Sequence, residues 1–383
     1  MAAEKPILVT GATLVFDEDT AGYGGPPGQV YAREVTNPDE VKAGLMELGV
    51  PRGLAQTLAD EDAKIGLRIY LLDNSGSTAA CDGNILRNMT MEGCSRWEEI
   101  CHMAEEHARW NMTIGVPCEF LLLNCPAKDA GSLLEGRDYV HLHRSKPASE
   151  ADQLASLRRI LDRNGPRGVT PMTKRVNEIH DRIKTQFTHL INEGQYVFFT
   201  IATDGMPTAP NSGDSTDQDQ RDFVKALRDL CMDTPVQLVI RLCTDDDKTV
   251  DFYNKLDEEL ELPLDILDDI CGEAKEIYDN GNRWLAYTPL MHKIREAGSM
   301  FKLLDLLDER ALVGPEIQRL VTLLSGSPNP LPTDSKQFCE AVAQLAETSK
   351  PVFDARLKRN GPFVNVPQLR GAMGVGGGCC TVM

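Results

Sequence analysis

The sequence lacks several features that define common classes of protein. No apolar run approaches the roughly 20 continuous residues of a membrane-spanning helix. Basic residues number 40 against 58 acidic residues, which gives a net charge of −18. Phosphate binding needs clustered Lys and Arg, so this balance argues against a nucleic-acid partner. The chain has no Cys-x-x-Cys pair and no histidine cluster, and therefore no zinc-site pattern.

The eleven cysteines do not form the pattern of a disulfide framework. Their number is odd, they are scattered, and several lie in apolar segments where a reduced cysteine acts as a small hydrophobic side chain. The first 22 residues contain an apolar run too short for a secretory signal. We therefore expect a reducing, cytosolic compartment. With 383 residues, 42% of them hydrophobic, the chain can build one large core with a smaller unit, or two domains.

From residue 65, segments typical of strands alternate with segments typical of helices. Most strand segments are near-continuous apolar runs, as expected of strands buried on both faces of a parallel sheet. The expected strands are 66–73, 118–124, 196–203, 236–243 and 262–267, with an alternating edge segment at 139–143. The expected helices are 95–110, 151–164, 172–192, 217–231 and 248–260. This order predicts a doubly wound α/β domain with a mostly parallel sheet, whose ligands bind outside the carboxyl ends of the strands. His141 and His143 fall on one face of the edge segment, where we expect an exposed pair.

The rest of the chain divides into three further parts. Residues 1–64 are expected to hold a strand, a loop and an N-terminal helical hairpin. Residues 299–349 carry the apolar stripes of a C-terminal helical extension. Residues 350–383 lose this periodicity, and we predict a basic flexible tail with a glycine spacer. Residues 45–52 are similar to the first loop of a ubiquitin-associated domain, which leaves a ubiquitin-pathway adaptor as one alternative, although we expect the hairpin to pack on the α/β domain.

Oxygen-bearing side chains follow two of the apolar strands. Asp73, Ser75 and Ser77 stand two residues apart at a strand end, so in an extended chain they project to the same side. Thr170 lies in a loop just before a helix, and Asp204 follows another apolar strand. Both loops belong to the edge of the sheet predicted for ligands. Hard oxygen ligands of this kind select Mg²⁺, with Mn²⁺ or Ca²⁺ as alternatives, over softer metals.

With these five residues in this order, region 65–298 resembles the von Willebrand factor type A (integrin I-like) domain with its metal-ion-dependent adhesion site. The resemblance implies that Ser75, Ser77 and Thr170 bind the metal through their hydroxyls. It implies that Asp73 and Asp204 hold the metal directly or through water. In such domains an open metal position commonly captures an Asp or Glu of a protein partner.

Two catalytic alternatives are weaker. The Gly-x-Ser-x-Gly pattern of a serine nucleophile fails around Ser75. A metal-dependent hydrolase using the same ion stays open, but the sequence offers no clear general base beside Asp73. An enzyme is therefore not the favoured interpretation.

The C-terminus has the pattern of a lipid anchor. Cys380 begins a Cys-a-a-X sequence that ends in Met383, which is typical of farnesylation. Cys379 is a possible palmitoylation site, and stable anchoring takes such a second signal. Five basic residues precede the glycine spacer, and each can add about 1 kcal/mol at an anionic cytoplasmic leaflet. They are Lys350, Arg356, Lys358, Arg359 and Arg370. We expect a protein anchored at the cytoplasmic face of a membrane, where it binds protein partners through the metal.

Overall fold

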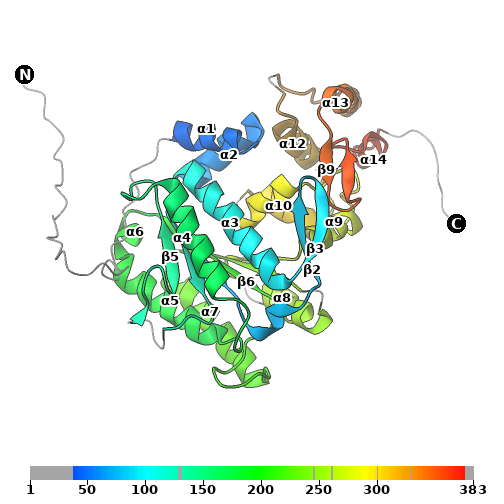
Figure 1. The fold of residues 1–383 in the computed structure, drawn as a ribbon. Helices are drawn as coiled ribbons and strands as arrows, with labels where there is room; N and C mark the ends of the chain where they lie inside the picture. Colours follow the sequence, from blue (N-terminus) through cyan, green and yellow to red (C-terminus); the bar gives the residue numbers. More distant parts are fainter. Residues whose placement is uncertain are drawn as a thin grey trace, which may run out of the picture.

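A six-stranded sheet forms the centre of the molecule (Figure 1). The computed structural model describes residues 38–127, 132–244, 246–259, 262–299, 301–327 and 329–375. The strand order is β5-β4-β1-β6-β7-β8, with β5 antiparallel at one edge and all other neighbours parallel. The strands are β1 (Ile65–Leu72), β4 (Cys118–Leu122), β5 (Tyr139–Leu142), β6 (Tyr196–Thr203), β7 (Val236–Leu242) and β8 (Leu264–Leu267). The prediction of a doubly wound, mostly parallel α/β fold is confirmed.

Helices cover both faces of this sheet, which explains why most residues of its strands are apolar. Alternate residues of β1 point to opposite faces: Leu67, Ile69 and Leu71 to one core, Tyr70 and Leu72 to the other. The first core includes side chains of α5 (Met172–Gln186), α7 (Asp217–Asp233) and α8 (Asp247–Glu259). The second includes α3 (Arg96–Ile114) and α4 (Glu150–Arg163), which lie in front of the sheet in Figure 1. Every residue of β1 is therefore buried.

A third core joins the two ends of the described chain. The N-terminal helical hairpin contributes Leu45 and Leu54, and the C-terminal helices contribute Leu307 and Phe338. The same cluster reaches Trp110 of α3, so the hairpin packs on the α/β domain as expected. The helices that contribute to this core include α1 (Pro38–Glu47), α2 (Arg52–Asp62), α9 (Ile270–Asp279), α10 (Pro289–Glu296), α11 (Lys302–Glu309), α12 (Gly314–Ser325) and α13 (Ser335–Thr348). The remaining elements of the α/β part are η1 (Gly76–Ala79), β2 (Gly83–Arg87), β3 (Thr90–Cys94) and α6 (Thr188–Asn192).

The prediction of a flexible tail from residue 350 is wrong for its described part. β9 (Val352–Asp354) and β10 (Arg359–Gly361) form an antiparallel hairpin, and α14 (Val366–Ala372) follows. Phe353 and Leu369 are buried in the third core, which fixes this unit against the extension. Lys350, Arg356, Lys358, Arg359 and Arg370 thus belong to a folded segment. Cys379, Cys380 and the N-terminal strand expected before residue 38 lie outside the described residues.

The expectation of an exposed histidine pair is also wrong. His141 and His143 are 4% and 3% exposed, because α4 packs on β5 and Arg182 of α5 approaches from the other side. The Nδ1 atom of His141 lies 3.3 Å from Oε1 of Glu119, which also accepts from Arg182 at 3.2 Å. Burial opposes ionisation of Glu119, but Arg182 and His141 lower its pKa to about 2. Separately, none of the described helices combines the length and apolar character needed to cross a bilayer.

Candidate metal site

Two neighbouring strands at the centre of the sheet place the predicted acidic residues side by side. Numbered along the chain, the sheet strands run 3-2-1-4-5-6, so the order reverses between β1 and β6. Such a reversal leaves a crevice at the carboxyl ends of the two strands. Asp73 directly follows β1 and Asp204 directly follows β6. The Asp73 amide donates to the carbonyl of Ala202 at 2.9 Å, which extends the strand pairing into the site.

Asp73 is held rigidly and is 1% exposed. Its Oδ1 accepts from the Ser75 amide at 2.8 Å, and its Oδ2 accepts from the Thr203 hydroxyl at 2.6 Å. Burial, and then the charge of Asp204, raise the pKa of Asp73 to about 6 despite these hydrogen bonds. Two buried carboxylates close enough to repel each other create a place where a bound cation is stabilised.

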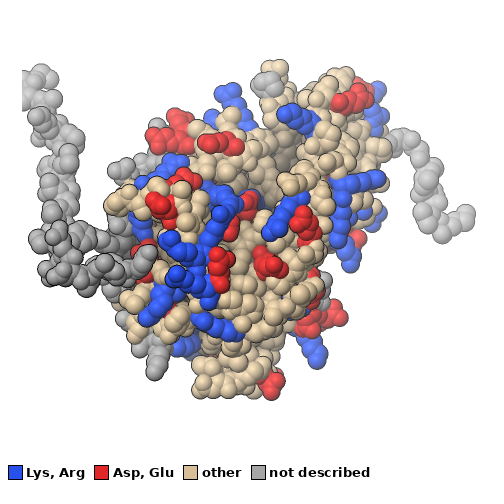
Figure 2. All heavy atoms as spheres, viewed as in Figure 1, with Lys and Arg blue, Asp and Glu red and all other residues tan. Residues whose placement is uncertain are grey.

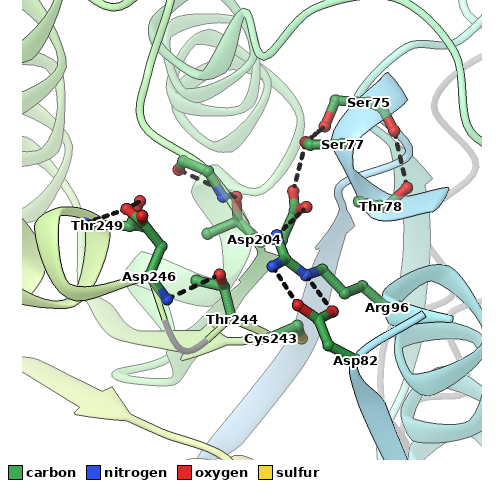
Figure 3. Close-up of polar contacts among 12 residues, drawn as sticks. Ser75, Ser77, Thr78, Asp82, Arg96, Asp204, Cys243, Thr244, Asp246 and Thr249 are labelled. Carbon is green, nitrogen blue, oxygen red and sulfur yellow. Dashed lines mark hydrogen bonds and ion pairs between the residues drawn. The ribbon is translucent and has the colours of Figure 1, made fainter. Parts of the chain in front are cut away.

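A chain of hydrogen bonds joins the serines to the second carboxylate. The Ser75 and Ser77 hydroxyl oxygens are 3.0 Å apart, and the Ser77 hydroxyl donates to Oδ1 of Asp204 at 2.9 Å (Figure 3). Ser77 lies in η1, the short turn that redirects the chain after β1. The three side chains come from two different strand ends, and they converge as the spacing of the sequence predicts.

Thr170 reaches the same place from the loop between α4 and α5. That loop is tied to the first one, because the Gly76 amide donates to the Gly168 carbonyl at 3.1 Å. A Cβ placed on Gly205 would lie 3.6 Å from Oγ1 of Thr170 and 3.9 Å from Oγ of Ser77. Both hydroxyls therefore border the space beside Gly205, and a glycine leaves that space open. All five predicted site residues are brought to one end of the sheet.

The sequence prediction missed one charged residue of the site, Arg96. Its Nη1 donates to Oδ2 of Asp204 at 3.0 Å, while Nε and Nη2 donate to Asp82 at 2.7 and 2.6 Å (Figure 3). Arg96 is the first residue of α3, where the side chain of Ser95 caps the helix. The hydrogen bonds from Arg96 also lower the pKa of Asp82. Arg96 thus offsets the negative charge of Asp204 from the side opposite Ser77.

Uncharged residues that the sequence also left unassigned shape the surrounding loops. Asn74 is fully buried and links two loops: Oδ1 accepts from the Asn124 amide at 2.8 Å, and Nδ2 donates to the Asn164 carbonyl at 3.0 Å. The Tyr253 hydroxyl donates to the Gly205 carbonyl at 3.0 Å. These contacts fix the backbone on both sides of the five oxygen-bearing side chains.

A further carboxylate near the site, Asp246, has a different role. It follows β7, and its Oδ2 accepts from the amide and hydroxyl of Thr249 at 3.0 and 2.9 Å (Figure 3). These bonds lower the pKa of Asp246 and hold the first turn of α8. The Asp246 side chain therefore stabilises the start of α8.

The donor set fits a hard divalent cation. No three His, Cys, Asp or Glu side chains of the described residues are grouped as metal ligands. The site contains two such carboxylates, so any metal here must take its remaining ligands from hydroxyls and water. Mg²⁺ accepts this combination, because it binds oxygen and commonly keeps several waters.

Comparisons with known proteins add no family assignment. No family model and no curated protein matches the chain. Among solved structures, one similar chain is titled "Crystal Structure of Uncharacterized Membrane Spanning Protein from Vibrio fischeri". It shares 12% identity over 57% of this chain and 98% of that chain, with a TM-score of 0.18. A TM-score this low supports no conclusion about fold or function.

Proposed function

We propose that the chain is a von Willebrand type A-like protein that binds Mg²⁺, or Mn²⁺ or Ca²⁺, and presents it to a protein partner. The metal ligands are Asp73, Ser75, Ser77, Thr170 and Asp204. The observation that carries the proposal is the convergence of these five oxygen-bearing side chains at the point where the strand order reverses. The raised pKa of Asp73 supports the proposal, because a bound cation would favour the ionised form of a carboxylate that burial and the charge of Asp204 both disfavour.

In this proposal the metal serves as a docking point. Two carboxylates balance the charge of a dication only formally, and neutral hydroxyls are weak donors, so the ion keeps a strong attraction for a further anion. A carboxylate from an Asp or Glu of the partner would complete its coordination. The residues of this chain hold the ion: Thr203 and the Ser75 amide orient Asp73, while Arg96 orients Asp204.

The location of this docking is part of the same proposal. Cys380, with Cys379 as a second lipidation site, would anchor the chain at the cytoplasmic face of a membrane. Lys350, Arg356, Lys358, Arg359 and Arg370 would add electrostatic attraction from the folded hairpin and its flanks. No specific observation in the structure favours the hydrolase or the ubiquitin adaptor over this function.

Thermal unfolding with and without Mg²⁺ tests the metal site. We expect Mg²⁺ at 100 times its dissociation constant to stabilise the wild-type protein by about 2.7 kcal/mol. Asp73→Ala and Thr170→Ala should abolish the gain, whereas Thr188→Ala, which removes a hydroxyl from an exposed helical position, should keep it. The proposal fails if millimolar Mg²⁺ leaves the melting temperature of the wild-type protein unchanged, or if Thr170→Ala responds like wild type.

A further inference from the structure

A cavity of about 380 Å³ opens at the carboxyl edge of the sheet, next to the candidate metal site. Its walls are formed by Pro126 and residues 134–137, all in the loop that joins β4 to β5, and by the C-terminal half of α4. The charged residues that line it are Glu135, Arg137, Arg159 and Arg163. Pro126 and Leu134 provide apolar parts of the wall. We call this space the arginine cavity.

Asn164 and Asn74 connect the arginine cavity to the metal site. Asn164 lines the cavity, and its carbonyl accepts from the side chain of Asn74 at 3.0 Å. Asn74 lies in the chain between Asp73 and Ser75, two of the proposed metal ligands. Arg167 lies in the loop that joins Asn164 to Thr170, and its amide donates to the Asn74 carbonyl at 2.8 Å. The loop that carries two of the proposed metal ligands is therefore hydrogen-bonded to a residue of the cavity wall.

The cavity has an excess of positive charge. Arg137 is paired with Asp138 at 2.6 Å, and Glu135 is paired with Lys146, so these two cavity residues are neutralised. The ion pairs found among the described residues include no acidic partner for Arg159, Arg163 or Arg167. Arg159 donates to the neutral Ser156 hydroxyl at 2.7 Å.

Within the described part of the chain, the guanidinium of Arg167 likewise donates to uncharged oxygens. Its guanidinium donates to the Asn124 carbonyl at 3.0 Å and to Oδ1 of Asn164 at 2.8 Å. Figure 2 shows Lys and Arg side chains gathered over the region of α4, although the whole chain carries a charge of −18. The arginines of α4 and of the loop after it thus form a local positive surface.

We propose that the arginine cavity is a second anion subsite for the same partner, and that this partner is a protein segment with several acidic residues. The inference rests on the proposed function: one carboxylate of the segment binds the metal, and a second enters the cavity beside Arg159 and Arg163. Arginine binds carboxylates through paired hydrogen bonds.

Fluorescence anisotropy with two labelled ten-residue peptides tests this subsite in excess Mg²⁺. One peptide is decaglutamate, and the other carries a single Glu among glycines. We expect the wild-type chain to bind decaglutamate more tightly than the single-Glu peptide. The double variant Arg159→Gln/Arg163→Gln should weaken decaglutamate binding by about 5- to 10-fold, as expected of two exposed charge pairs. Its binding of the single-Glu peptide should not change.

Arg158→Gln is the matched control, because Arg158 is the neighbour of Arg159 on α4 but pairs with Glu105 at 2.9 Å. It should keep the wild-type preference for decaglutamate. Wild-type binding that shows no such preference, or a double variant that binds decaglutamate as tightly as the wild-type chain does, overturns the subsite. Failure of the metal site has a different signature: EDTA and Asp73→Ala would then leave binding of the single-Glu peptide unchanged, whatever the arginine variants do.

Discussion

Asp73→Asn should change how the stability of the metal-free protein depends on pH. In the folded protein, burial and the charge of Asp204 raise the pKa of Asp73 from 3.8 to about 6. The folded state therefore holds this proton more tightly than the unfolded state does. The resulting stabilisation is fully present below about pH 4 and is lost as the pH rises through about 6.

The size of this effect follows from the two pKa values. A difference of roughly two pH units corresponds to about 3 kcal/mol, at about 1.4 kcal/mol per unit. Asn cannot ionise, so the variant should lack this loss between pH 4 and pH 8.

Urea unfolding in EDTA, followed by circular dichroism at several pH values, measures the effect. The free energy of unfolding of Asp73→Asn minus that of wild type should rise by about 3 kcal/mol between pH 4 and pH 8. Other titrating groups are common to both proteins and largely cancel in this difference. A difference that stays flat over this range would show that Asp73 does not have the raised pKa and would refute the reasoning.

Three further substitutions have defined outcomes. Arg96→Gln should lower the stability of the metal-free protein by about 1–3 kcal/mol, because the fully buried Asp204 side chain loses a charged donor. It should also tighten Mg²⁺ binding, because a competing cation is removed. Calorimetry that finds an unchanged Mg²⁺ affinity contradicts this second expectation. Phe353→Ala should cost about 3–5 kcal/mol in urea unfolding, since Phe353 is 1% exposed in the third core; a change near zero would mean that the hairpin is not part of that core. Cys380→Ser should move the protein expressed in a eukaryotic cell from the membrane fraction to the soluble one, and equal distribution of both forms argues against the lipid anchor.

The sheet and the oxygen-bearing residues could be predicted because their signals are local. β1 and β6 are buried on both faces, which requires continuous apolar runs, and each run ends at a carboxylate. Parallel strands bring such ends to one edge, so Asp73 and Asp204 could be expected to meet. The serines follow at a spacing of two.

The contacts of Arg96 could not be predicted in the same way. Arg96 and Asp82 are separated by the β2–β3 hairpin, and Asp204 lies 108 residues from Arg96 in the chain. No periodicity relates these positions. The capping sequence that begins at Ser95 marks the start of α3, but the direction of the Arg96 side chain depends on how α3 packs on the sheet.

The C-terminal hairpin was missed for a related reason. β9 and β10 have three residues each, too few to show an alternating pattern. Their basic residues and the nearby Pro and Gly resemble a linker in composition. The hairpin is nevertheless ordered, because Phe353 and Leu369 are buried against helices that lie earlier in the chain. Burial of single side chains in a distant core leaves no local signal.

Direct binding of Mn²⁺, followed by electron paramagnetic resonance, tests the metal site most directly, because free and bound Mn²⁺ give different signals. Wild-type protein should bind one Mn²⁺ per chain at this site, and Mg²⁺ should displace it. Asp73→Ala and Thr170→Ala should lose that bound ion while they keep the fold, as judged by circular dichroism. Equal Mn²⁺ binding by wild type and both variants would contradict a metal site formed by Asp73, Ser75, Ser77, Thr170 and Asp204.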